Sequence, residues 1–393
     1  MDDQRAYRIH SISLVNIDDT VFRQYQAHSQ RGQIAAAHYL GLLDTIRDGI
    51  RQLGATPPGA VRLTQEAWDT QEAILRAQGL NEALIQSLRE LQGPADQGIA
   101  ALPAELAELW DDLGRRQRFV ERAAVFDRDH LPRITVEDQR ERLTEVGEHL
   151  AASSVDAAAS QARALGIEEI SVTWEFPIAK AAFGYTREQH DPGQAQLMGF
   201  WRRGHIENKF PIYAAASNTE AVLVTLAPTA VLSFVQDQVG IRRDETGNPR
   251  LILLRWMIEE PAIAEIVHTL THSLSHLLLR GLDDGQIGLA EGGLAEWLVP
   301  EALSFAIYAD NVRDFTLGSL WTLLTNRALS WLEGVPARAL SCENDPLCHQ
   351  GSPRRCERCL YLTFGCPQFN DGLDRSLVAD FLRHHGALGA EAE

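Results

Sequence analysis

Five cysteines form the most chemically informative group in this chain of 393 residues, because all of them lie between residues 342 and 366. Cys356 and Cys359 make a Cys-x-x-Cys pair, whose tight turn points two sulfur atoms at one ion. Further cysteines on both sides of this pair could complete a tetrahedral shell of four thiolates. The sequence therefore predicts one structural Zn²⁺, with ligands drawn from Cys342, Cys348, Cys356, Cys359 and Cys366.

Spacing alone leaves open which four of the five cysteines bind. The three preferred ligands are Cys356, Cys359 and Cys366. Cys342 and Cys348 compete for the fourth position, with His349 as an outside candidate. Disulfides, an iron–sulfur cluster and free buried thiols are the alternatives to zinc. Disulfides need an oxidising compartment and usually an even number of cysteines, and the spacing lacks the ferredoxin run of an iron–sulfur protein.

A second group of candidate ligands lies on a predicted helix that Pro261 begins and Gly281 ends. His268, His272 and His276 recur every four residues, so they share the face opposite to a stripe of leucines and isoleucines. Glu296 follows and could contact them as a hydrogen-bond partner. We interpret the four residues as a polar or interface stripe; the alternative is a metal-dependent hydrolase or nuclease site.

The charge balance argues against a broad duplex-binding surface, because the formal net charge is −18. The chain has only two lysines, Lys180 and Lys209, and neither lies in a phosphate-binding loop. The chain should therefore have no ATPase activity of its own. Arg202 and Arg203 are candidate contacts for single-stranded nucleic acid, although pairing with some of the 54 carboxylates is the favoured interpretation. No apolar run is long enough to span a membrane, and no apolar signal core opens the chain, so we expect a cytoplasmic protein.

Hydrophobic periodicity gives the expected fold class, which is α+β and mostly α-helical. Residues 1–160 are predicted to form an N-terminal helical array of unknown role. Residues 165–260 are expected to form a small mixed sheet, in a β-rich segment that leads into the zinc domain. Residues 261–393 should form a helical zinc-binding domain, in which Asp374 caps the last helix.

The order of motifs in the C-terminal half resembles a known family. The matching segments are FGYTR (183–187), HSLSHLLLR (272–280), FAIYADN (305–311), LGSLW (317–321), CENDPLC (342–348), CERC (356–359) and CPQFNDGLDR (366–375). This series is similar to the MrfA-type zinc-binding (MZB) domain, most closely in the form found at the C-terminal end of DrmB, a subunit of the DISARM anti-phage system. The resemblance covers about residues 165–385.

That resemblance implies a zinc-stabilised module that works beside a DNA helicase. The chain departs from the helicase-fused members of the family because it carries no helicase motor. It therefore looks like a non-catalytic accessory subunit of a prokaryotic defence or DNA-processing complex. Its partner would be a helicase or another defence subunit, and nucleic acid would be reached through the complex.

Overall fold

The structure is a computed structural model that describes most of the second half of the chain and parts of the first. The described residues are 8–17, 35–36, 38–41, 65–77, 85, 113–128, 130–186, 196–197, 213–240, 246–283, 293–310, 318–356, 358–362 and 365–388. Two compact units divide the chain. The sheet unit consists of Met1–Asp18 with Ala124–Glu393, and the second unit of Asp19–Ala123.

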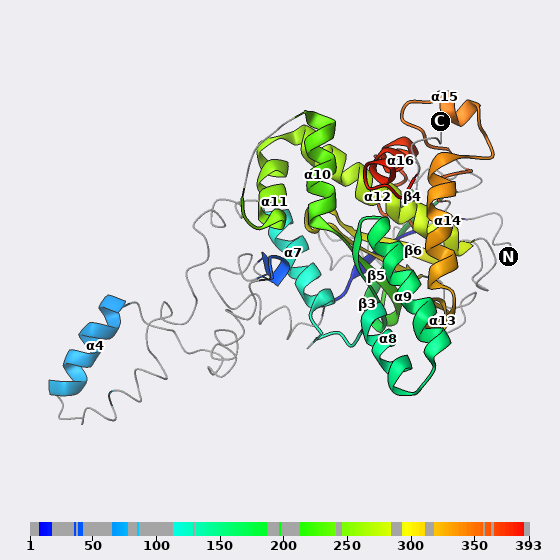
Figure 1. The fold of residues 1–393 in the computed structure, drawn as a ribbon. Coiled ribbons are helices and arrows are strands. Elements are labelled where there is room, and N and C mark those ends of the chain that lie inside the picture. The colour runs from blue at the N-terminus through cyan, green and yellow to red at the C-terminus, as the bar shows by residue number, and fades with distance from the viewer. Residues whose placement is uncertain are drawn as a thin grey trace. The chain divides into compact units, whose positions relative to one another are not determined.

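One antiparallel sheet organises the sheet unit (Figure 1). Its strands run in the order β1-β3-β5-β7-β6, and the short strands β2 and β4 both pair with β3. Every pairing between described strands is antiparallel. The bounds are β1 (Arg8–Val15), β2 (Ile134–Thr135), β3 (Ile167–Thr186), β4 (Gln196–Leu197), β5 (Tyr213–Leu226), β6 (Leu294–Val299) and β7 (Ser304–Ala309).

The two faces of this sheet are covered by different parts of the chain. On one face, α9 packs on β3, α13 packs on β3 and β5, and α12 packs on β6 and β7. On the other, an apolar cluster includes the stacked rings of Phe176 and Tyr308, whose centroids lie 5.3 Å apart, and the partly buried Trp297. Because side chains alternate between the two faces of a strand, Glu296 lies on the face opposite to Trp297, toward α12.

The helices of the sheet unit follow one another along the chain between and after the strands. Their bounds are α8 (Val136–Glu145), α9 (His149–Ala164), α10 (Pro228–Val239), α11 (Pro249–Glu259), α12 (Pro261–Asp283), η3 (Pro300–Ala302), α13 (Ser319–Asn326), α14 (Ala328–Leu340), α15 (Leu347–Gln350) and α16 (Arg375–His384). Helix α7 (Leu113–Phe126) begins in the second unit and ends in the sheet unit. Helix α14 packs against α9, α12 and α16.

Helix α12 is the longest described helix and the one that carries the histidines. Pro261 begins it, as its fixed φ and missing N–H favour the first helical turn. Leu270, Leu274 and Leu277 are fully buried along one stripe. Gly281 lets α14 approach closely, because a Cβ there would lie 2.3 Å from the Arg338 guanidinium. The helix is therefore held between the sheet on one side and the C-terminal segments on the other.

The predicted fold class is wrong in its arrangement. The sheet is a single antiparallel sheet that takes strands from residues 8–15 through 304–309, not a small mixed sheet within 165–260. The helices that the structure describes are spread along the chain and do not form a clear N-terminal helical array. The pairing of β1 with β3 joins segments far apart in the sequence, which local periodicity cannot reveal. The division into 1–160, 165–260 and 261–393 stays a prediction, although both of its last two segments contribute strands to this sheet.

The second unit contains α4 (Gln65–Ala77) and most of α7. Tyr39 and Phe119 are buried against each other, with ring centroids 5.5 Å apart, and the Arg122 guanidinium lies 4.8 Å from the Tyr39 ring centroid. Such a contact between a cation and an aromatic ring stabilises local packing. Among all the described helices, none combines the length and the apolar character that crossing a bilayer requires.

Candidate metal centres

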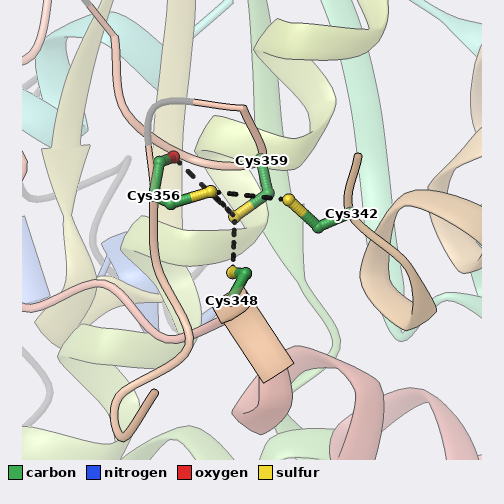
Figure 2. Close-up of side chains that lie close together, drawn as sticks. All are labelled: Cys342, Cys348, Cys356 and Cys359. Carbon is green, nitrogen blue, oxygen red and sulfur yellow. Dashed lines mark hydrogen bonds between the residues drawn. The ribbon is translucent and has the colours of Figure 1, made fainter. Parts of the chain in front are cut away.

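Four of the five cysteines come together where the chain leaves α14. Cys342 lies just after this helix, Cys348 lies in the short helix α15, and Cys356 and Cys359 lie in the loop that follows (Figure 2). Asp345 fixes the turn between the first two, because its carboxylate accepts from the Cys342 backbone N–H at 2.8 Å. We call these four cysteines the cysteine centre.

The sulfur atoms of the cysteine centre have the spacing of a metal shell. Sγ of Cys342 lies 3.4 Å from that of Cys356, and Sγ of Cys359 lies 3.6 Å from that of Cys348 and 3.7 Å from that of Cys356. All four lie within 4.8 Å of one another. Zinc–sulfur bonds of about 2.3 Å in a tetrahedron put sulfur atoms about 3.8 Å apart. The four side chains could thus hold one metal ion.

The thiols of this centre do not share one acidity. Burial raises the pKa of Cys342 to about 11. Burial acts in the same direction on Cys356, but hydrogen bonds from the Arg358 N–H, the Cys342 thiol and Cys359 outweigh it and lower that pKa to about 7. Burial raises the pKa of Cys359. A bound cation would favour the thiolate form of all of them, because metal ligation requires the deprotonated sulfur.

Arg375 connects the cysteine centre to the body of the fold. Its side chain is fully buried, and its guanidinium donates to the Asp345 carboxylate at 3.1 and 3.3 Å. Its backbone N–H donates to the Arg354 carbonyl at 2.8 Å, and the neighbouring Asp374 N–H donates to Ser273 Oγ on α12 at 2.8 Å. The predicted cap of the last helix is confirmed, because the Asp374 carboxylate accepts from the backbone N–H of Ser376.

The fifth cysteine belongs to a second group. Cys366, preferred from spacing as a ligand of the same ion, lies instead with His272 and His276 of α12 and Glu296 of β6. We call these four residues the histidine centre. Their candidate ligand atoms also lie within 4.8 Å of one another. The sequence placed the two histidines and Glu296 near each other correctly, but the loop that brings Cys366 to them gave no local signal.

Distances within the histidine centre are those of close polar contacts. Nε2 of His272 and Nε2 of His276 lie 3.0 and 2.9 Å from the same oxygen of Glu296. Nε2 of His272 also lies 3.3 Å from Cys366 Sγ. The three side chains from α12 and β6 are at most 1% exposed. They form a buried polar cluster, not the solvated stripe that the helix pattern alone allowed.

The charges in the histidine centre depend on one another. Burial opposes ionisation of Glu296, but His276 and His272 outweigh it and hold the pKa of the carboxyl well below its usual range. Burial, followed by the negative charge of Glu296, raises the pKa of the Cys366 thiol. A buried carboxylate needs a cationic or hydrogen-bonding partner, and the two histidines and Ser275 surround that of Glu296.

A glycine positions Cys366. Gly365 has a φ of +87°, which favours glycine, and a Cβ on it would lie 2.3 Å from the Leu294 carbonyl oxygen of β6. Its own carbonyl accepts from the Glu296 backbone N–H at 2.9 Å. The loop therefore lies directly on β6, and the next residue reaches the histidines.

Two other candidate residues, His268 and His349, do not join either centre. His268, the first of the three helix histidines, has its Nε2 3.8 Å from a Glu301 oxygen, and its side chain is 42% exposed. His349 is exposed on α15, where its ring lies 3.4 Å from the Arg354 guanidinium. Arg202 and Arg203 lie outside the described residues.

Neither a scan against protein-family models nor a search of curated proteins found a match to this chain.

Proposed function

We propose that this protein is a non-catalytic zinc-binding accessory subunit of a prokaryotic anti-phage defence or DNA-processing complex. It would act in the cytoplasm with a separate helicase or nuclease partner and reach nucleic acid through that complex. The proposal is carried by one observation, the cysteine centre, whose four sulfur atoms have the mutual spacing of a tetrahedral zinc shell.

The donor set of the cysteine centre favours a structural ion. Four thiolates close the shell of a zinc ion and leave no position for water or substrate, and soft sulfur ligands select zinc over magnesium or calcium. The zinc would supply folding free energy to the segment between α14 and α16. The similarity of the motifs to the MZB domain supports the link to a helicase partner.

The burial and the membership of the histidine centre disfavour the hydrolase alternative. A catalytic zinc keeps an open coordination position for water. His272, His276 and Glu296 are at most 1% exposed, and His268 does not belong to their group. A buried and closed group of this kind suits a structural role.

Two measurements test the proposal. Elemental analysis of the purified chain should find zinc, and the Cys356→Ser variant should contain one zinc fewer per chain. Affinity capture of the tagged chain from its native cells should recover a protein with helicase or nuclease motifs, and the His349→Gln variant should recover the same protein. Capture of no such protein under conditions that preserve the zinc would contradict the accessory role.

A further inference from the structure

The histidine centre contains a donor and acceptor conflict that a proton or a metal ion must resolve. Nδ1 of His276 lies 2.6 Å from the Leu360 carbonyl oxygen, which can only accept, so Nδ1 carries a hydrogen. Nε2 of the same ring faces a Glu296 oxygen at 2.9 Å. If this ring is neutral, its Nε2 presents a lone pair to a carboxylate. The pair therefore requires a proton, carried either by His276 Nε2 or by the Glu296 carboxyl, or a cation between the two atoms.

His272 and Cys366 favour the cation. Nε2 of His272 faces the same Glu296 oxygen at 3.0 Å and also Cys366 Sγ at 3.3 Å. A proton between His276 and Glu296 would satisfy only the contact between these two residues. A metal ion in the middle would serve two imidazoles, the carboxylate and the sulfur together, and each of these groups is a zinc ligand.

Outer contacts orient three of the four ligands as a metal site requires. The Leu360 carbonyl holds the His276 ring with Nε2 turned inward. Ser275 Oγ donates to the second Glu296 oxygen at 2.6 Å, which leaves the first oxygen for the ion. The Asn370 backbone N–H points at Cys366 Sγ at 3.2 Å, a contact that stabilises a thiolate. Such outer contacts fix the ring orientation and basicity of metal ligands.

We propose that the histidine centre binds a second divalent transition-metal ion, by preference zinc, through His272 Nε2, His276 Nε2, a Glu296 oxygen and Cys366 Sγ. This site goes beyond the zinc-binding role of the cysteine centre. Bonds of about 2.0–2.3 Å in a tetrahedron separate ligand atoms by about 3.3–3.8 Å, so the contacts of 2.9–3.3 Å need to open by only a few tenths of an ångström.

The ion would act as a structural clamp. It would join α12, β6 and the loop after Cys359, three segments that do not adjoin one another in the sequence. The two centres would also be coupled, because Leu360 follows a ligand of the cysteine centre and its carbonyl orients a ligand of the histidine centre. Four protein ligands and full burial of three of them leave no open position for a substrate.

X-ray absorption at the zinc edge, combined with elemental analysis of the full-length protein, tests this inference without any substitution. Two zinc ions per chain should give an average shell of about 2.5 sulfur and about 1.5 nitrogen or oxygen atoms per zinc, with two distinct bond lengths near 2.3 and 2.0 Å. One zinc in an all-sulfur shell would overturn the histidine centre and leave the cysteine centre intact. One zinc in a shell of one sulfur and three lighter atoms would support the histidine centre and contradict the cysteine centre.

Two matched variants on α12 assign the second ion to its ligands. His276→Gln should lose one equivalent of zinc and shift the average shell toward sulfur alone. His268→Gln, which changes a histidine of the same helix outside the centre, should keep both equivalents. If His276→Gln keeps two zinc ions, or if His268→Gln loses one, the proposed ligand set is wrong. The absorption spectrum of the unmodified protein decides the question should His276→Gln fail to fold.

Discussion

Substitution of Cys359 by serine should release the ion of the cysteine centre and loosen the segment between α14 and α16. Few large apolar side chains are buried among the described residues of this segment, 341–374. Its buried aliphatic side chains are Leu360, Leu362 and Leu373. Burial of each leucine contributes about 1.5–3 kcal/mol. A structural zinc contributes on the order of 10 kcal/mol to folding, so the metal stabilises the segment more than any one of these side chains does.

The loss should be visible in the amides that turn around the cysteines. The backbone N–H groups of Leu360 and Tyr361 both donate to the Cys356 carbonyl, and that of Cys348 donates to the Asn344 carbonyl. Loss of even a third of the metal's free energy would speed their exchange by about 250-fold, since each 1.4 kcal/mol corresponds to about a factor of ten.

Hydrogen–deuterium exchange read by mass spectrometry is the assay. The amides of Leu226 and Ala227, which bond within the sheet region at 2.8 Å, should keep their protection and serve as internal references. His349→Gln is the control variant, because it changes α15 beside a ligand but removes no sulfur. If Cys359→Ser loses its metal while residues 341–374 stay as protected as before, the structural role of the ion is refuted.

Three further outcomes follow from single contacts. Gly365→Ala places a Cβ 2.3 Å from a carbonyl oxygen at a φ of +87°, so the free energy of unfolding should fall by about 1–3 kcal/mol or more in a denaturant titration; an unchanged value would contradict the close approach to β6. Arg375→Met removes the buried hydrogen-bond donor of the partly exposed Asp345 and should destabilise the fold by about 1.5–3 kcal/mol, whereas a neutral result would show that the pair is dispensable. Burial opposes ionisation of Asp345, but the Cys342 N–H and the charge of Arg375 outweigh it and hold the pKa of this carboxyl below its usual value. The contribution of Asp345 to stability is therefore present above about pH 4 and lost as the pH falls through its pKa in the folded protein. Asp345→Asn should flatten that part of a profile of stability against pH. An unchanged slope would contradict this contribution.

The sequence predicted those parts of the sites that depend on local spacing. The Cys-x-x-Cys pair, the cap at Asp374 and the shared face of His272 and His276 all lie within a few turns of chain, and the structure contains each of them. A metal-binding group of four cysteines is likewise present, while the identity of its metal stays a prediction.

The position of Cys366 could not be predicted in this way. The short stretch of chain between Cys359 and Cys366 would allow Cys366 to join either the cysteine centre or the histidine centre. A long-range contact decides which of the two centres it joins. Gly365 binds to β6, a strand that lies far earlier in the sequence, and this contact directs Cys366 to the histidines. No periodicity in the loop itself carries that information.

The sheet was mispredicted for a related reason. The last eight residues of β3 read AKAAFGYT, and alanine, glycine and lysine are all depleted in strands. These residues form a strand because other strands pair on both sides of it. On one side β1 pairs with it, with Arg8 opposite Thr186, and on the other side β5 pairs with it, with Tyr213 opposite Ala182. Residues 251–257, too short and apolar to assign by periodicity, lie in the helix α11. Tertiary pairing decides the structure of β3, whereas α11 begins at a local signal, the cap of Asn248 followed by Pro249.

Native mass spectrometry of the intact chain tests the zinc-binding role most directly, because the mass difference from the metal-free chain counts the bound zinc ions. The measurement compares the unmodified protein with Cys356→Ser, prepared identically. We expect Cys356→Ser to carry one zinc ion fewer than the unmodified protein, whatever the histidine centre binds. An unmodified protein without zinc, or equal zinc counts in the two proteins, would contradict the cysteine centre as a zinc site.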